Sequence, residues 1–119
     1  MTQKPRGLSR LIRATLYSFD GLVSAFVSET AFRQEVALFA ILSPLTFVFD
    51  VSASERALMV ASLMLVLIVE IINTAIEATI ERISNERHPL SKKAKDCASA
   101  AVFLSLVNAV LVWLLILAG

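Results

Sequence analysis

The chain of 119 residues has little of what soluble enzymes commonly use to build a site. Its one cysteine, Cys97, excludes an internal disulfide and a thiolate metal cluster, and its place at the start of an apolar run favours a packed thiol. Its one histidine, His88, has no histidine or cysteine at metal-ligand spacing, which argues against zinc. A net charge of +1 gives no global field that would attract nucleic acid.

The common phosphate-binding and catalytic motifs of soluble proteins are also missing. The sequence contains no GxxxxGK[ST] loop, no GxGxxG loop, no protein-kinase catalytic loop and no GxSxG elbow. The first thirty residues hold no unbroken apolar stretch of the kind found in signal peptides, so we expect the amino terminus to be retained. An enzyme with this sequence would have to build its site from helices at a membrane surface.

Apolar residues are abundant instead. They make up 57% of the chain, and the mean hydropathy is +0.77, which favours a small integral membrane protein of one domain, residues 1–119. The pattern predicts an all-α fold with three transmembrane helices over about 31–49, 56–80 and 97–118. The first span is the shortest, and we expect Pro44 to kink it.

A fourth helix, over about 6–28, is predicted to lie along the membrane surface. Its apolar residues recur at steps of three and four, with Arg10, Arg13 and Asp20 on the opposite face. A simple anchor or topology signal is an equally good interpretation. Ten of the eleven basic residues, Lys4 among them, precede the first span or lie between the second and third, and only Arg56 falls elsewhere. The positive-inside rule then predicts a cytoplasmic amino terminus and a periplasmic carboxyl terminus.

Three polar residues stand inside the second span. Glu70, Asn73 and Glu77 are spaced i, i+3, i+7 and so share one helical face. An ionisable group in hydrocarbon is costly, so such a carboxylate marks a functional site. Glu77 reaches the cytoplasmic boundary, at the level of Glu29, and the two carboxylates would either share a cation such as Mg²⁺ or stay separately solvated.

The third span opens with a basic segment. Ser91 is the expected N-cap, and Lys92, Lys93 and Lys95 stand where the helix dipole is already positive. Such a helix end can bind phosphate, or the lysines can serve only to keep the loop in the cytoplasm. Three spans cannot alone shield Glu70 and Asn73 from lipid, which favours an oligomer, and the small residues 98–101 would permit close helix approach.

Three segments, Glu29–Glu35, Val69–Glu77 and Ala94–Ala101, resemble the prokaryotic diacylglycerol kinase family in their order and spacing. The resemblance implies a homotrimer in the bacterial inner membrane, with active sites that we expect neighbouring subunits to share. It implies transfer of the γ-phosphoryl group from MgATP to diacylglycerol, which gives phosphatidic acid.

The resemblance also assigns roles to residues. Glu70 matches the general base, with Asn73 beside it, and Glu29 and Glu77 match the Mg²⁺ ligands. The residues expected to contact ATP are Arg10, Tyr17, Glu29, Glu77, Glu86, Arg87, His88, Lys95 and Asp96. The residues expected to contact the lipid are Arg10, Ala14, Ser18, Phe19, Ala31, Phe32, Arg33, Gln34, Glu35, Arg56, Glu70, Ser99 and Trp113.

Other functions stay open at this point. The same framework could phosphorylate a long polyprenol, as an undecaprenol kinase does, because no pocket dimension follows from the sequence. An oligomeric ion or proton channel would use Glu70 as a pore carboxylate, and a structural membrane subunit would merely bury its polar groups.

Overall fold

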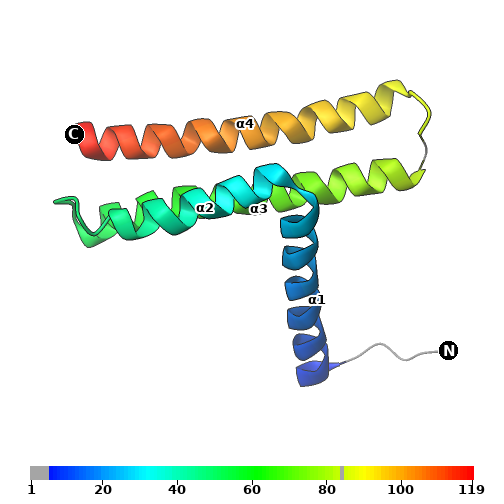
Figure 1. Ribbon diagram of the computed structural model, residues 1–119, viewed down its shortest axis with the longest axis horizontal. Helices are drawn as coiled ribbons and strands as arrows, with labels where there is room; N and C mark the ends of the chain where they lie inside the picture. Colours follow the sequence, from blue (N-terminus) through cyan, green and yellow to red (C-terminus); the bar gives the residue numbers. More distant parts are fainter. Residues whose placement is uncertain (1–5, 84) are drawn as a thin grey trace.

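The computed structural model describes residues 6–83 and 85–119, which form four helices and no strand (Figure 1). They are α1 (Gly7–Ser28), α2 (Thr30–Leu45), α3 (Ala53–Ile83) and α4 (Pro89–Ala118). The predicted all-helical fold is confirmed. Lys4, counted in the charge pattern, lies outside the described residues.

α2, α3 and α4 form a bundle, and α1 projects away from it. α3 and α4 make an antiparallel hairpin, α2 packs along α3, and α1 projects from the bundle at a steep angle (Figure 1). Within the part of the chain that the structure describes, only α3 and α4 are long and apolar enough by themselves to cross a membrane. α2 has 16 residues, a length of about 24 Å at 1.5 Å per residue, and this accounts for its absence from that pair.

Pro44 stands at the end of α2. The helix stops at Leu45, and the chain continues through a tight turn in which Phe47 N–H donates to Pro44 O at 3.1 Å and Val48 N–H to Leu45 O at 3.0 Å. The predicted kink is therefore wrong, because no helical turn follows Pro44 to be bent. Proline lacks the amide hydrogen of a regular turn, and bonds of shorter span close this helix end.

The last helix begins earlier than the apolar run suggests. α4 starts at Pro89, and His88 is its N-cap, with Nδ1 accepting a hydrogen bond from Leu90 N–H at 3.1 Å. Ser91 is thus inside the first turn, and its prediction as the cap is wrong. Proline at the first helical position needs no hydrogen-bond partner for its nitrogen, which makes His88–Pro89 a strong helix start.

The buried residues of the hairpin are few, and those on α4 are small. On α3 they include Met59, Ser62, Val66 and Glu70, spaced by three and four residues, and on α4 they are Ala98, Ser105 and Ala109. The buried hydroxyls of Ser62 and Ser105 each donate to a carbonyl of their own helix, at 2.7 Å. Small side chains at this seam allow the two helices to approach closely.

Most apolar side chains point outward. Phe103 is 65% exposed, Leu104 64% and Leu115 72%, and Cys97 is exposed as well, so the prediction of a packed thiol is wrong for a single chain. Of the small residues 98–101, only Ala98 is buried. An apolar surface of this extent requires lipid or other subunits around it.

Candidate active site

A ladder of polar side chains runs along α3. The Asn73 amide nitrogen donates to Glu70 Oε2 at 3.2 Å and to Glu77 Oε1 at 2.8 Å, so one side chain holds two carboxylates. We call Glu70, Asn73 and Glu77 the acidic ladder. Glu70 is only 5% exposed, whereas Glu77 is partly open. The ladder thus leads from a buried carboxylate toward the end of the helix.

A pocket of about 770 Å³ opens where α3 turns into α4. This volume lies in the range of small-molecule sites, roughly 300–1,000 Å³. The residues that line it are Ile80, Glu81, Asn85, Glu86, Arg87, His88, Pro89, Ser91, Lys92, Lys95 and Asp96. Five residues of the predicted ATP set are therefore brought together: Glu86, Arg87, His88, Lys95 and Asp96.

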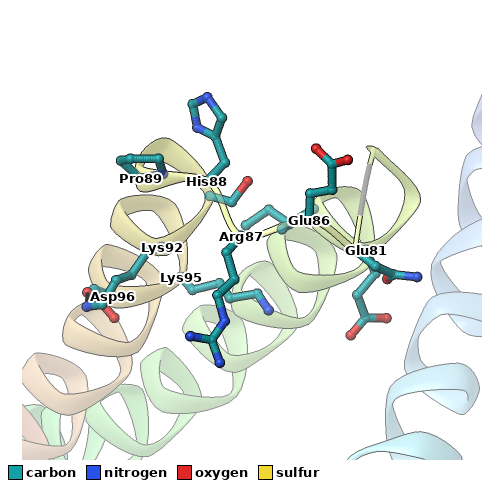
Figure 2. Close-up of a pocket in the computed structure, with 11 residues that line it drawn as sticks. Glu81, Glu86, Arg87, His88, Pro89, Lys92, Lys95 and Asp96 are labelled. Atoms are coloured by element: carbon teal, nitrogen blue, oxygen red, sulfur yellow. Dashed lines mark hydrogen bonds and ion pairs between the residues drawn. The ribbon is translucent and has the colours of Figure 1, made fainter.

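The side chains of this pocket differ in direction. Figure 2 shows Arg87 and Lys95 reaching into the space between α3 and α4, while Glu86 and the His88 ring point away from it. Lys92 forms an ion pair with Asp96, with 2.6 Å between Nζ and Oδ2. Two cationic groups and the amino-terminal end of α4 therefore face one cavity, and each of these features favours a bound anion.

The acidic ladder ends beside this pocket. Glu77 precedes the pocket residue Glu81 by four residues on α3, a rise of about 6 Å. The two lie on the same helical face. A ligand in the pocket could extend toward Glu77, and Glu70 lies about 10 Å deeper along α3.

The second carboxylate that we expect to bind Mg²⁺ lies between α1 and α2. Glu29 joins α1 to α2 and is half-buried. Within residues 6–83 and 85–119, no group of three or more His, Cys, Asp or Glu side chains is arranged to hold a metal ion. A Mg²⁺ site needs only one or two protein carboxylates, and the pairing of Glu29 with Glu77 stays a prediction.

Glu35 stands opposite the acidic ladder. It lies in the second turn of α2, and its carboxyl group is near that of Glu70 on α3. One of its oxygens, Oε2, is buried and has no hydrogen-bond partner. The packing of α2 on α3 thus joins a residue of the predicted lipid set to the predicted base.

The predicted residues of the surface helix lie away from the pocket. Arg10, Ala14, Tyr17, Ser18 and Phe19 are all exposed on α1, and none of them lines the pocket at the α3–α4 turn. The carboxyl-terminal half of α1 instead borders a second, apolar pocket of about 670 Å³. Its lining residues are Leu22, Val23, Phe26, Phe32, Val36, Met64, Leu67, Ile68, Ile71 and Ile72.

Three further residues of the predicted lipid set bond to the backbone. Arg33 donates to Phe26 O at 2.7 Å and to Val27 O at 2.9 Å, which satisfies the carboxyl-terminal end of α1. Arg56 donates to Thr46 O at 3.1 Å, and Trp113 donates to Met59 O at 3.1 Å. The remaining members, Ala31, Gln34 and Ser99, are exposed.

Arg56 and Trp113 are also distant from the pocket at the α3–α4 turn. Arg56 precedes the pocket residue Glu81 by twenty-five residues of α3, which is about 38 Å of helix. These two residues and the pocket therefore cannot touch one small ligand on the same chain.

The pocket includes residues that motif matching did not single out. Glu81 and Asn85 line it beside the predicted ones. The position of Glu81, four residues after Glu77, could have indicated it, since residues at that spacing share a helical face. The Asn85 contribution depends on the shape of the α3–α4 turn, which no periodicity gives.

Comparison of the sequence with known proteins assigns the chain to a family. The family model described as "Prokaryotic diacylglycerol kinase" matches residues 16–117. A diacylglycerol kinase of Pseudomonas aeruginosa is 54% identical over 95% of this chain and 92% of its own length. Those of Haemophilus influenzae and Escherichia coli K12 are 48% identical over 92% of this chain and 44% identical over 98%, and the alignments cover 93% and 96% of them. The chain belongs to the prokaryotic diacylglycerol kinase family.

Proposed function

We propose that the protein transfers the γ-phosphoryl group of ATP to the free hydroxyl of diacylglycerol at the cytoplasmic face of the bacterial inner membrane. The observation that carries the proposal is the acidic ladder of Glu70, Asn73 and Glu77. It joins a buried carboxylate to a cation-lined pocket on a helix that can cross a bilayer. Such a path links a lipid site in the membrane to a nucleotide site in water.

The membrane placement rests on α2 as a third span. Its helix of about 24 Å is shorter than a hydrocarbon core of about 30 Å, but the turn after it continues with Phe47 and Val48, which are 75% and 78% exposed. If α2, α3 and α4 cross the membrane, α1 lies along the membrane surface, because it stands at a steep angle to the other three helices (Figure 1). The basic residues at the α3–α4 turn then face the cytoplasm, and the carboxyl terminus is periplasmic.

The level of α1 also fits a pocket in water. The α1–α2 corner packs on α3 as far as Ile72, and Glu81 of the pocket lies nine residues beyond, about 13 Å farther along the helix. If α1 marks the membrane surface, the pocket stands on its cytoplasmic side. ATP could therefore enter the pocket without leaving water.

In this pocket Arg87, Lys95 and the first turn of α4 would bind the triphosphate. Glu29 and Glu77 would hold Mg²⁺, because carboxylate oxygens are the ligands it prefers, and the Asn73 amide is bonded to Glu77 through Oε1 alone. Bound Mg²⁺ supplies charge neutralisation of the phosphates. The protein's own part is then mostly positioning and charge stabilisation.

Glu70 would act as the general base. It takes the proton of the lipid hydroxyl as that oxygen bonds to the γ-phosphorus, and the bond from phosphorus to the bridging oxygen of ADP breaks. The rise of about 10 Å between Glu70 and Glu77 requires the hydroxyl to enter below the phosphates. The Asn73 amide fixes both carboxylates across that interval.

The direct test is an assay of the purified protein with labelled ATP, Mg²⁺ and mixed micelles that contain either diacylglycerol or undecaprenol. Labelled phosphatidic acid is the expected product. Faster labelling of undecaprenol would assign the polyprenol as the substrate, and no labelled lipid in either micelle would overturn the proposal.

We further propose that the enzyme is a homotrimer in which neighbouring subunits share each active site. Arg10 and Tyr17 do not line the pocket of their own chain, and the exposed apolar faces of α3 and α4 offer a surface for association. Mixed trimers of Glu70→Gln and Glu29→Gln chains should then regain part of the activity that each variant lacks alone. Absence of any rescue would contradict shared sites.

A further inference from the structure

The corner between α1 and α2 is built on a single residue. Glu29 has an extended backbone, with φ −115° and ψ 111°, and separates Ser28, the last residue of α1, from Thr30, the first residue of α2. α1 is 22 residues long, about 33 Å, and Ala25 is the one residue of this helix that is buried. A long helix with so little buried surface can swing about such a corner unless another contact fixes the angle.

Arg33 makes that contact. From the first turn of α2, its Nη1 donates to Phe26 O at 2.7 Å and to Val27 O at 2.9 Å, and its Nη2 donates to Thr30 Oγ1 at 3.1 Å. The Phe26 and Val27 carbonyls are among the last four of α1, which have no partner within the helix. One side chain therefore bonds to both sides of the corner, and its planar guanidinium holds these acceptors in fixed directions.

The charge of Arg33 also suits this place. The carboxyl-terminal end of a helix carries partial negative charge, which a nearby cation stabilises. α1 has no basic residue in its own last turn. It thus receives from α2 the positive charge that its own sequence does not supply, and a role in lipid contact alone does not explain this arrangement.

The backbone of Glu29 is held at the same corner. Glu29 N–H donates to Ala25 O at 2.9 Å, and Arg33 N–H donates to Glu29 O at 3.2 Å. Glu29 occupies the N-cap position of α2, but its side chain makes no capping hydrogen bond. The corner therefore fixes the backbone of Glu29 without using its carboxylate for the cap.

We propose that Arg33 is a positioning residue, whose hydrogen bonds fix the α1–α2 corner and so place the Glu29 carboxylate for Mg²⁺. The inference rests on the proposed function only where it takes Glu29 as a Mg²⁺ ligand. A carboxylate on a fixed backbone loses less conformational freedom when it binds a cation than one on a swinging corner does. We call the three side-chain hydrogen bonds of Arg33 the corner clamp.

Hydrogen exchange measures the corner clamp without turnover. Arg33→Met keeps an apolar stem and removes every donor of the side chain. In detergent micelles without ATP, Mg²⁺ or diacylglycerol, the amides of residues 26–29 should exchange at least about tenfold faster than in the wild type, the scale of one hydrogen bond to a charged group. Arg13→Met is the matched control, because Arg13 is exposed on α1, and it should leave these amides unchanged. Unchanged exchange in Arg33→Met would overturn the proposal.

Kinetics separate the corner clamp from a lipid contact. If the corner places Glu29, Arg33→Met should raise the apparent KM for Mg²⁺ by roughly tenfold and leave the KM for diacylglycerol within about twofold. A rise confined to the KM for diacylglycerol would make Arg33 a lipid contact and overturn the proposal. An equal rise of the KM for Mg²⁺ in Arg13→Met would overturn it as well, since any lost positive charge would then have the same effect.

Each variant is first checked for assembly by size-exclusion chromatography. If Arg33→Met does not assemble, Arg33→Lys replaces it, because lysine keeps the charge and lacks the planar fork of donors. Both readouts should then move in the same direction by a smaller amount. The exchange measurement contains no substrate, so faster exchange in a protein whose wild type labels no lipid would contradict the proposed function and not the corner clamp.

Discussion

The two ends of α3 carry similar side chains and use them differently. At the α2–α3 end, Arg56 and Trp113 donate to backbone carbonyls, and Glu55 forms a reciprocal cap with Ser52, with bonds of 2.9 and 3.1 Å. At the α3–α4 end, Arg87 and Lys95 extend into a cavity (Figure 2). The acidic ladder ends one turn of α3 before this cavity. Polar side chains that bond to backbone groups stabilise a turn. Polar side chains that surround a cavity are available to a ligand.

The difference follows from what each end must connect. The α2–α3 turn is short and must hold three helix ends together, so Arg56 bridges Thr46 O and Val51 O and stacks on Phe47 at 4.7 Å. The α3–α4 connection is capped by His88 itself through its Leu90 contact. The bases beside that cap are therefore not required to close the turn.

The largest effect should come from the buried carboxylate of the ladder. We expect Glu70→Gln to lower kcat by roughly 10²–10⁴-fold, the usual contribution of a general base, because an amide cannot accept the hydroxyl proton. Phosphatidic acid formation under saturating MgATP measures it. Glu55→Gln, the carboxylate at the other end, should leave kcat within about twofold, since it affects only an exposed cap. Equal losses in both variants would remove the distinction between the two ends.

A smaller effect should follow from one base of the pocket. Lys95→Met should raise the KM for ATP by roughly 10- to 100-fold, the scale of one charge-assisted hydrogen bond, with the apolar stem of the side chain retained. Lys93→Met is the matched control, because Lys93 belongs to the same helical segment and does not line the pocket. A similar rise of KM in both variants would mean that the pocket binds ATP only through its general positive charge.

Helix positions and the acidic ladder could be predicted from the sequence because both depend on local periodicity. The spacing of Glu70, Asn73 and Glu77 puts them on one face of any α-helix, and the Asn73 hydrogen bonds confirm that they meet. The start of α4 could not be placed from the apolar run, because the His88 cap and Pro89 decide it.

Contacts between helices could not be predicted from the sequence. The proximity of Glu35 to Glu70 depends on how α2 packs along α3, and the spacing within either helix does not contain that register. Arg33, Arg56 and Trp113 were matched to a lipid path by family position, and their backbone hydrogen bonds became visible only with the turns in place. Long polar side chains near helix ends have two possible uses, and geometry separates them.

The smallest expected effect tests the structural end. Trp113→Phe removes the Nε1–H bond to Met59 O and keeps a ring that can pack at right angles on Phe49, whose centroid lies 6.3 Å away. The free energy of unfolding should fall by about 0.5–1.5 kcal/mol, the net value of one hydrogen bond, as measured by denaturation in detergent. The kcat and the KM for ATP should stay within about twofold, because Trp113 lies at the opposite end of the bundle from the pocket. Loss of activity at unchanged stability would instead make Trp113 part of the lipid path, and the two ends would no longer divide into structure and function.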